Sequence, residues 1–170
     1  MKYIVLCLLT MMSSIVGQAQ IIKAELTATG LTCSMCSRAT YKQLTSIPEV
    51  ENVDTDLNNT AFIIHFKKGS KVNIADLREK VEAAGFSIGE LLLTMRLGNQ
   101  QSANNSSFLQ DNIKYTFMDS KNTVLTGDVQ LKVLDKGFVV DKEYKKLLKM
   151  AKQFPGYAAG NPNTYHVKTM

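Results

Sequence analysis

The first half of the chain alternates between two periods of hydrophobic residues. Four stretches place apolar side chains at every second position and are predicted to be strands: residues 21–29, 50–57, 61–66 and 86–97. Two stretches repeat apolar side chains at helical spacing and are predicted to be helices: residues 34–46 and 74–84. The resulting order, β-α-β-β-α-β, is that of a ferredoxin-like split βαβ fold.

One face of each predicted element should contribute to the core. The inward side chains of the first and third strands are expected to be Ile22, Ala24, Leu26, Ala28, Phe62, Ile64 and Phe66. In the second helix, Asn73 is a favourable N-cap and Gly85 is a favourable residue for the C-terminal end. The first helix has a more polar inner face, because Ser37 and Thr40 stand where aliphatic side chains would pack better.

The second half of the chain has a different organisation. Residues 98–107 are Asn, Gln and Ser with almost nothing apolar, which predicts a linker. Beyond it, alternation predicts strands at residues 113–118, 124–134 and 164–168. Asp141 is expected to cap a helix that has a clear apolar stripe. We therefore expect an α+β protein in which residues 108–170 form a small β-rich domain with one amphipathic helix, shaped as a partly open barrel.

Residues 1–19 have the pattern of a secretory signal peptide. Lys2 gives a positive start, an apolar stretch follows it, and Gly17 and Ala19 are small residues in front of a cleavage point. A retained N-terminal anchor is the competing interpretation. Cleavage would release an exported protein, periplasmic or secreted, whose first domain spans residues 20–97. No later stretch is long and apolar enough to span a bilayer, so no stable membrane insertion is expected after cleavage.

The formal net charge is +5, and most of the lysines are scattered over predicted helix faces. There is no Arg-rich stripe and no basic run interleaved with aromatic residues, so nucleic-acid binding is not expected. The last predicted helix carries a denser group: Lys142, Lys145, Lys146, Lys149 and Lys152. A solvated helix face explains this group, and docking to an acidic partner or a membrane surface is the alternative.

Two cysteines remain after the signal peptide, Cys33 and Cys36, at the start of the first predicted helix. Their Cys-x-x-Cys spacing lets both sulfurs converge on one soft ion, and a helix N-terminus stabilises thiolates. Two thiolates suit Cu(I) first, with Hg(II) and Ag(I) behind it. Structural Zn(II) takes four ligands, and neither His65 nor His166 is an obvious addition. A thiol–disulfide redox site is the main alternative for the same pair.

The residues around the cysteines resemble the heavy-metal-associated domain family. Residues 30–36, Gly-Leu-Thr-Cys-Ser-Met-Cys, match the family motif Gly-Met-Thr-Cys-x-x-Cys except at Leu31. Residues 84–86, Ala-Gly-Phe, match the end of the family's second helix, whereas Glu49 replaces a usual glycine in a turn. The resemblance covers residues 21–93. It implies metal binding at the two cysteines, with Leu31 and Phe86 packing beside the metal loop.

The family includes copper chaperones, the N-terminal modules of copper-pumping ATPases and a periplasmic mercury-binding protein. We therefore expect an exported protein that binds Cu(I) and passes it to or from a copper pump or chaperone by ligand exchange. Zn(II) remains a further candidate metal. Periplasmic Hg(II) capture and thiol–disulfide exchange are the alternatives, and a third is an interaction protein whose metal module acts as a sensor. No acid/base pair or Ser/His/Asp set is recognisable, so we expect no enzyme activity, and we expect a monomer.

Overall fold

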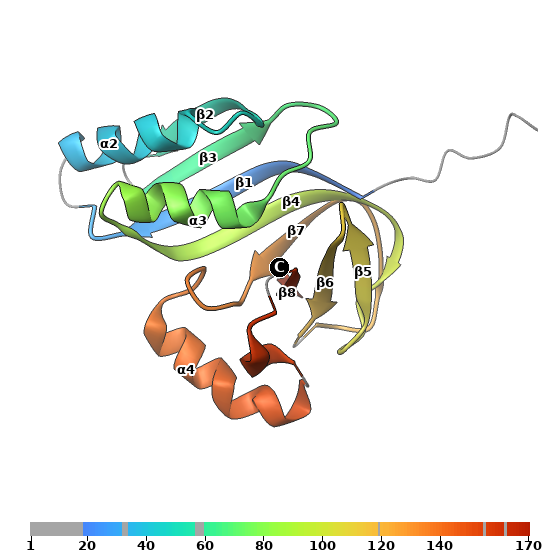
Figure 1. Ribbon diagram of the computed structural model, residues 1–170. Coiled ribbons are helices and arrows are strands. Elements are labelled where there is room, and N and C mark those ends of the chain that lie inside the picture. The colour runs from blue at the N-terminus through green and yellow to red at the C-terminus, as the bar shows by residue number, and fades with distance from the viewer. Residues whose placement is uncertain (1–18, 32–33, 57–59, 119, 155, 162) are drawn as a thin grey trace, which may run out of the picture.

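The computed structural model describes residues 19–31, 34–56, 60–118, 120–154, 156–161 and 163–170. Its elements are shown in Figure 1. In chain order they are β1 (Gln20–Thr29), α2 (Ser34–Thr45), β2 (Val50–Asp56), β3 (Ala61–Phe66), α3 (Ile74–Ala83), β4 (Ser87–Gln101), β5 (Ser107–Gln110), β6 (Ile113–Phe117), β7 (Val124–Val133), α4 (Asp141–Met150), the 3₁₀ turns η2 (Ala151–Gln153) and η3 (Tyr157–Ala159), and β8 (Thr164–Thr169).

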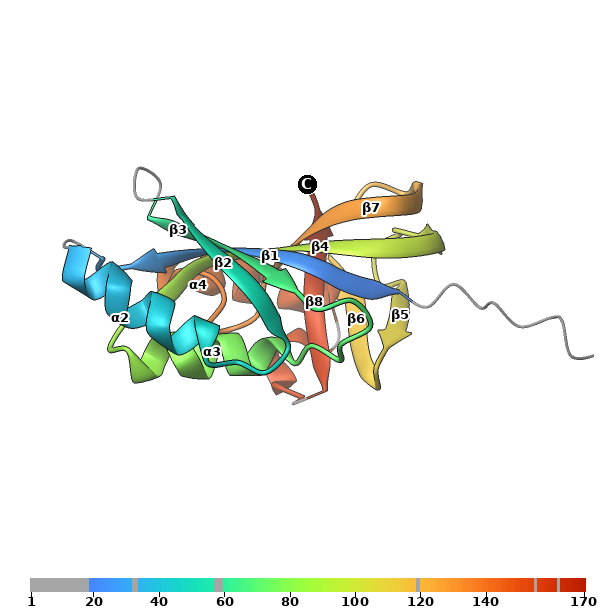
Figure 2. The same ribbon diagram turned by 90° about the horizontal axis from the view of Figure 1, so that it is seen from above.

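The described strands form one sheet in the order β2-β3-β1-β4-β7-β8-β6-β5. Neighbouring strands are antiparallel except β6 and β8, which are parallel. Helices α2 and α3 lie on the same face of the first four strands, as Figure 2 shows from above. This arrangement of β1, α2, β2, β3, α3 and β4 is the predicted ferredoxin-like fold. The remaining strands extend its sheet beyond β4.

A β-bulge at the start of β1 changes which isoleucine is buried. The register with β4 shifts between Ile21 and Lys23, so that an extra residue is inserted on the β1 side. Ile21 consequently faces the core and is 1% exposed, whereas Ile22 is only half-buried. The expectation that Ile22 faces inward is therefore wrong, while the other predicted core residues of β1 and β3 are buried.

Part of the predicted linker belongs to the sheet. Residues 98–101 continue β4, and Gln100 and Gln101 pair with Leu125 and Val124 of β7. Backbone pairing supplies these hydrogen bonds whatever the side chains are, so a polar composition does not prevent a strand. Ser102 follows and is fully buried, and its hydroxyl lies within hydrogen-bond distance of the carbonyls of Lys121 (2.6 Å) and Thr123 (3.1 Å), which satisfy this buried polar group. The short strand β5 also begins inside the predicted linker, at Ser107.

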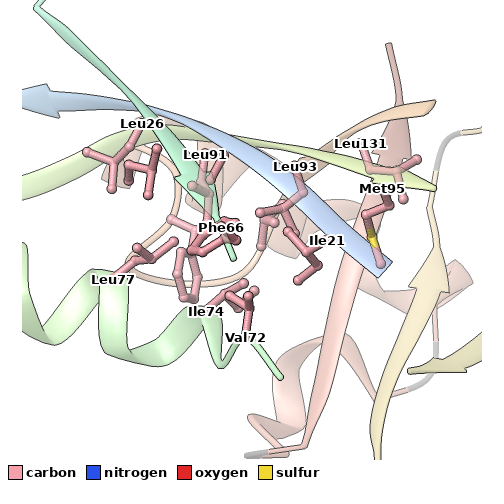
Figure 3. Packing of buried hydrophobic residues seen from close by; sticks show 14 of the residues in the cluster. Ile21, Leu26, Phe66, Val72, Ile74, Leu77, Leu91, Leu93, Met95 and Leu131 are labelled. Atoms are coloured by element: carbon pink, nitrogen blue, oxygen red, sulfur yellow. The ribbon is translucent and has the colours of Figure 1, made fainter. Parts of the chain in front are cut away.

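A single large core cluster runs under the sheet from the first strands to the last. Figure 3 shows Leu77 and Ile74 of α3 packed beneath Leu26 and Leu91, with Leu131 of β7 at the other end of the cluster. A stripe of large apolar side chains thus continues across the junction of β4 and β7. Burial of this continuous apolar surface is the main force that joins the two halves of the chain.

Helix α4 packs on a smaller second cluster. Its half-buried Tyr144, Leu147 and Leu148 contact a buried group made of Met118, Leu134, Phe154 and Tyr157. The expected cap is wrong by one residue: Val140 is the N-cap and has no side-chain cap bond, and Asp141 is the first helical residue. The helix dipole still stabilises an acidic side chain in this first turn. None of the described helices is long and apolar enough to cross a membrane.

Candidate metal centre

The predicted metal loop begins where β1 ends. Thr29 pairs with Ser87 of β4, and its hydroxyl donates to the Ser87 carbonyl at 3.2 Å. Gly30 then adopts a φ of +84°, a left-handed conformation that glycine takes without a steric penalty. The end of β1, paired with β4, therefore holds the entry to the loop, and the chain turns at Gly30.

Two apolar side chains support the loop from the core side. Leu31 and Phe86 are both half-buried and pack against the main core cluster. A Cβ placed on Gly30 would lie 3.7 Å from Cδ1 of Phe86, so this ring is a direct neighbour of the turn. Their positions agree with the packing that the family resemblance implies for them.

Cys36 lies in the first turn of α2, two residues after the helix begins at Ser34. Its carbonyl oxygen accepts a hydrogen bond from the hydroxyl of Thr40 at 3.2 Å. Thr40 is fully buried, so this bond satisfies a polar group on the core side of the helix. The bond was not predicted, although a threonine four residues after the cysteine is its sequence signal. Thr40 can therefore be buried on the core-facing side of α2, because its hydroxyl is bonded to the backbone carbonyl of Cys36.

The other predicted ligand, Cys33, lies outside the described residues. Cys36 itself is disulfide-bonded in the structure. A disulfide sulfur presents no thiolate, whereas a metal needs the deprotonated thiol as its ligand. The described geometry therefore belongs to an oxidised form, and metal binding would require reduction of that bond.

Helix α2, which carries Cys36, has no negatively charged side chain. Arg38 and Lys42 are exposed along it. The N-terminal end of a helix carries a partial positive charge, which stabilises an anion placed in its first turn. A thiolate at Cys36 would therefore be favoured by the helix itself. Met35, next to the cysteine, is 79% exposed.

The two histidines of the described chain are engaged elsewhere. His65, in the middle of β3, has its Nε2 3.3 Å from a carboxylate oxygen of Asp54. His166 in β8 is buried, with its Nδ1 2.9 Å from Asp135. No group of three or more His, Cys, Asp or Glu side chains gathers among the described residues. A closed four-ligand zinc site is therefore not assembled there.

Comparison with known proteins finds a family match within the first half of the chain. Residues 25–87 match the model of the heavy-metal-associated domain. Among solved structures, a CopZ metallochaperone is 24% identical over 39% of this chain and 97% of its own, with a TM-score of 0.36. A yeast copper transporter domain, solved in apo and Cu(I)-loaded states, is 25% identical over 38% of this chain and 88% of its own, with a TM-score of 0.35.

A third similar structure is the N-terminal domain of a potential copper-translocating P-type ATPase from Bacillus subtilis, in its Cu(I)-loaded state. It is 23% identical over 49% of this chain and 95% of its own, with a TM-score of 0.36. No curated protein matches the chain.

The family match includes both cysteines of the predicted site and ends at Ser87, where β4 begins. Strands β5 to β8 and helix α4 lie beyond it. The resemblance seen in the sequence is thus confirmed for this part of the chain. Residues 25–87 of this chain match the heavy-metal-associated domain family.

Proposed function

We propose that this chain is an exported metal-trafficking protein that holds one Cu(I) ion between the thiolates of Cys33 and Cys36. The observation that carries the proposal is the Cys-x-x-Cys sequence within the segment that matches the heavy-metal-associated domain, with Cys36 in the first turn of α2. Soft thiolates select Cu(I) over hard cations, and Cu(I) accepts low coordination numbers. The first turn of α2 adds a favourable partial charge for the thiolates.

The transfer step in this proposal is ligand exchange. A thiolate of the partner protein forms a bond to Cu(I), after which one of the two cysteine–copper bonds breaks. A second thiolate of the partner then displaces the remaining cysteine, and the released thiolates can take up protons. The exposed position of Met35, beside Cys36, supports an approach from this side. The partner is of the copper-pump or copper-chaperone type, and no catalytic role is assigned to the chain.

The disulfide at Cys36 favours one second candidate, a thiol–disulfide redox protein. Opening the bond takes two electrons and two protons and yields two thiols. Metal capture needs that reduction once, before loading, whereas a redox protein would cycle through it. Measuring the reduction potential and the reduction of insulin disulfides separates the two: rapid insulin reduction would favour the redox function.

The export part of the proposal rests on the signal-peptide pattern of residues 1–19. The described strand β1 begins at Gln20, directly after the expected cleavage point, so cleavage would remove none of the sheet. Periplasmic Hg(II) capture remains the competing cargo, because the same dithiolate binds both ions.

Transfer kinetics test the exchange mechanism. Reduced, Cu(I)-loaded chain is mixed with a small dithiol at increasing concentration, and the release of copper is followed. Associative exchange makes the rate rise with the concentration of the incoming thiol. A rate that stays constant would mean that copper leaves before the acceptor arrives, and it would refute ligand exchange.

A further inference from the structure

Helix α4 carries a row of five lysines that the metal function does not use. These are Lys142, Lys145, Lys146, Lys149 and Lys152, the last in the turn η2 that continues the helix, and we name them the α4 lysine row. We propose that the α4 lysine row binds the anionic headgroups of a lipid membrane, so that the protein associates peripherally with a membrane surface. The proposal is independent of the metal site.

The spacing of the lysines places them along one face. Lys145 and Lys146 are adjacent in the sequence, and the other successive members lie three residues apart, so all five fall within about one third of the helix circumference. All five are exposed. From the first to the last they cover about 15 Å along the helix axis. The result is a broad band of ammonium groups along one face of the helix, which fits a planar charged surface.

The row is not neutralised by the protein. Among the described residues, the ion pairs involve other cations, such as Lys132, which contacts Glu90 at 2.8 Å and Glu143 at 2.9 Å. Glu143, one of the two acidic residues in the first turn of α4 beside Asp141, is thus already paired with a lysine of β7. Like charges four residues apart on a helix, such as Lys142 and Lys146, repel each other and destabilise the helix. The fold therefore carries a repulsive row whose charges are available to an outside anion.

The apolar face of α4 is already occupied. Its half-buried side chains pack on the second core cluster, as described above: Tyr144, Leu147, Leu148 and Ala151. An amphipathic helix that inserts into a bilayer needs such a face free. Binding through α4 would therefore be electrostatic and peripheral, with the helix resting on the headgroups.

The composition of the exposed face favours lipid over protein. The exposed residues of α4 are Asp141 and four of the lysines, with no aromatic or arginine side chain among them. The cores of protein interfaces are depleted in lysine, and their energetic anchors are usually Trp, Tyr and Arg. Lysine also lacks the planar fork that recognises one phosphate group specifically. A row of point charges suits a surface with many mobile anions.

The position of α4 is compatible with simultaneous metal exchange. In Figure 1 α4 lies at the lower edge of the molecule and α2 at the upper edge, with α3 between them. A membrane in contact with the α4 lysine row would leave the N-terminal end of α2 accessible to a partner.

The test is sedimentation of the full mature chain with lipid vesicles. Vesicles of phosphatidylcholine are compared with vesicles that also contain phosphatidylglycerol, at low and high salt. Each lysine near an anionic surface strengthens binding roughly fivefold, so the triple variant Lys142→Gln, Lys146→Gln, Lys149→Gln should bind roughly a hundredfold more weakly. Glutamine has a helix propensity similar to that of lysine, so the helix should persist, as circular dichroism will check.

A matched control removes the same charge elsewhere: Lys68→Gln, Lys114→Gln, Lys121→Gln, three exposed lysines outside α4. Its binding should weaken less than tenfold, and wild-type binding should vanish at about 1 M salt, where the screening length is near 3 Å. Equal losses in both triple variants would mean that net charge alone acts and would overturn the proposal. It would also be overturned if the wild type failed to bind the anionic vesicles, or if a short DNA duplex bound more tightly than the vesicles.

Discussion

Replacing Leu131 by alanine tests whether the two halves of the sheet unfold together. Leu131 of β7 is fully buried and pairs in register with Leu93 of β4, which is also fully buried. These residues join the ferredoxin-like half of the sheet to the strands beyond β4. The account predicts that a defect at this junction weakens both halves, although the metal loop itself is untouched.

The expected loss follows from the burial of this side chain. Truncating a fully buried leucine to alanine costs about 2–5 kcal/mol, because apolar contacts are lost and a cavity remains. For a domain of this size, each kcal/mol lowers the melting temperature by about 2–4 °C, so a fall of roughly 5–15 °C is expected. Val124 in the same strand is 67% exposed, and Val124→Thr should change the stability by less than about 0.5 kcal/mol.

Hydrogen exchange measures which strands lose stability in the Leu131→Ala variant. If the sheet opens as one unit, amides of β1 and β3 should lose as much protection as amides of β7 and β8. The reasoning would be refuted if Leu131→Ala exposed β7 and β8 while β1 and β3 kept wild-type protection. In that case the two halves would be separate cooperative units.

Two further predictions use particular contacts. Gly137 and Gly127 both have positive φ, but a Cβ on Gly137 would lie 2.7 Å from Cδ of Arg78, whereas nothing lies within 4 Å at Gly127. Gly137→Ala should therefore lower the free energy of unfolding more than Gly127→Ala in urea titrations, where backbone strain alone costs about 1–2 kcal/mol; equal losses would contradict a role for the Arg78 contact. Burial raises the pKa of Tyr115 and of Tyr157 above that of free tyrosine. Stability should be complete below about pH 10 and fall above it, because the unfolded chain loses these protons first; an unchanged urea midpoint between neutral pH and pH 11 would be the contrary result.

The first half of the fold was predictable because its patterns are local. Alternation identified β3, and Asn73 caps α3 as expected, with its side chain accepting from the amide of Ala75. Residue Gly85 follows the helix with a φ of +87°. The bulge that buries Ile21 instead of Ile22 was not predictable, because it depends on pairing with β4, which lies far away in the sequence.

The structure of the second half was harder to predict, because strand pairing determines it more than the composition of each segment does. Residues 98–101 are polar but form part of a strand, because they lie beside β7. Their side chains show no periodicity from which this strand could have been predicted. Strand β5 is short, and its apolar Leu109 is exposed, whereas the sequence pattern would place an apolar residue in the core. At the site, the motif identified the cysteines, whereas the bond from Thr40 to the Cys36 carbonyl depends on helix geometry. The assignment of Cys33 as a ligand stays a prediction.

The central claim is that Cys33 and Cys36 together bind one Cu(I). It is tested most directly by anaerobic titration of the reduced mature chain with Cu(I) against a competing chelator, beside the variant Cys33→Ser, Cys36→Ser. The account predicts one tightly bound Cu(I) per chain, complete loss of that binding in the double variant, and loss on oxidation of the wild type. Failure of the reduced wild type to compete for Cu(I), or equal binding by the double variant, would contradict it.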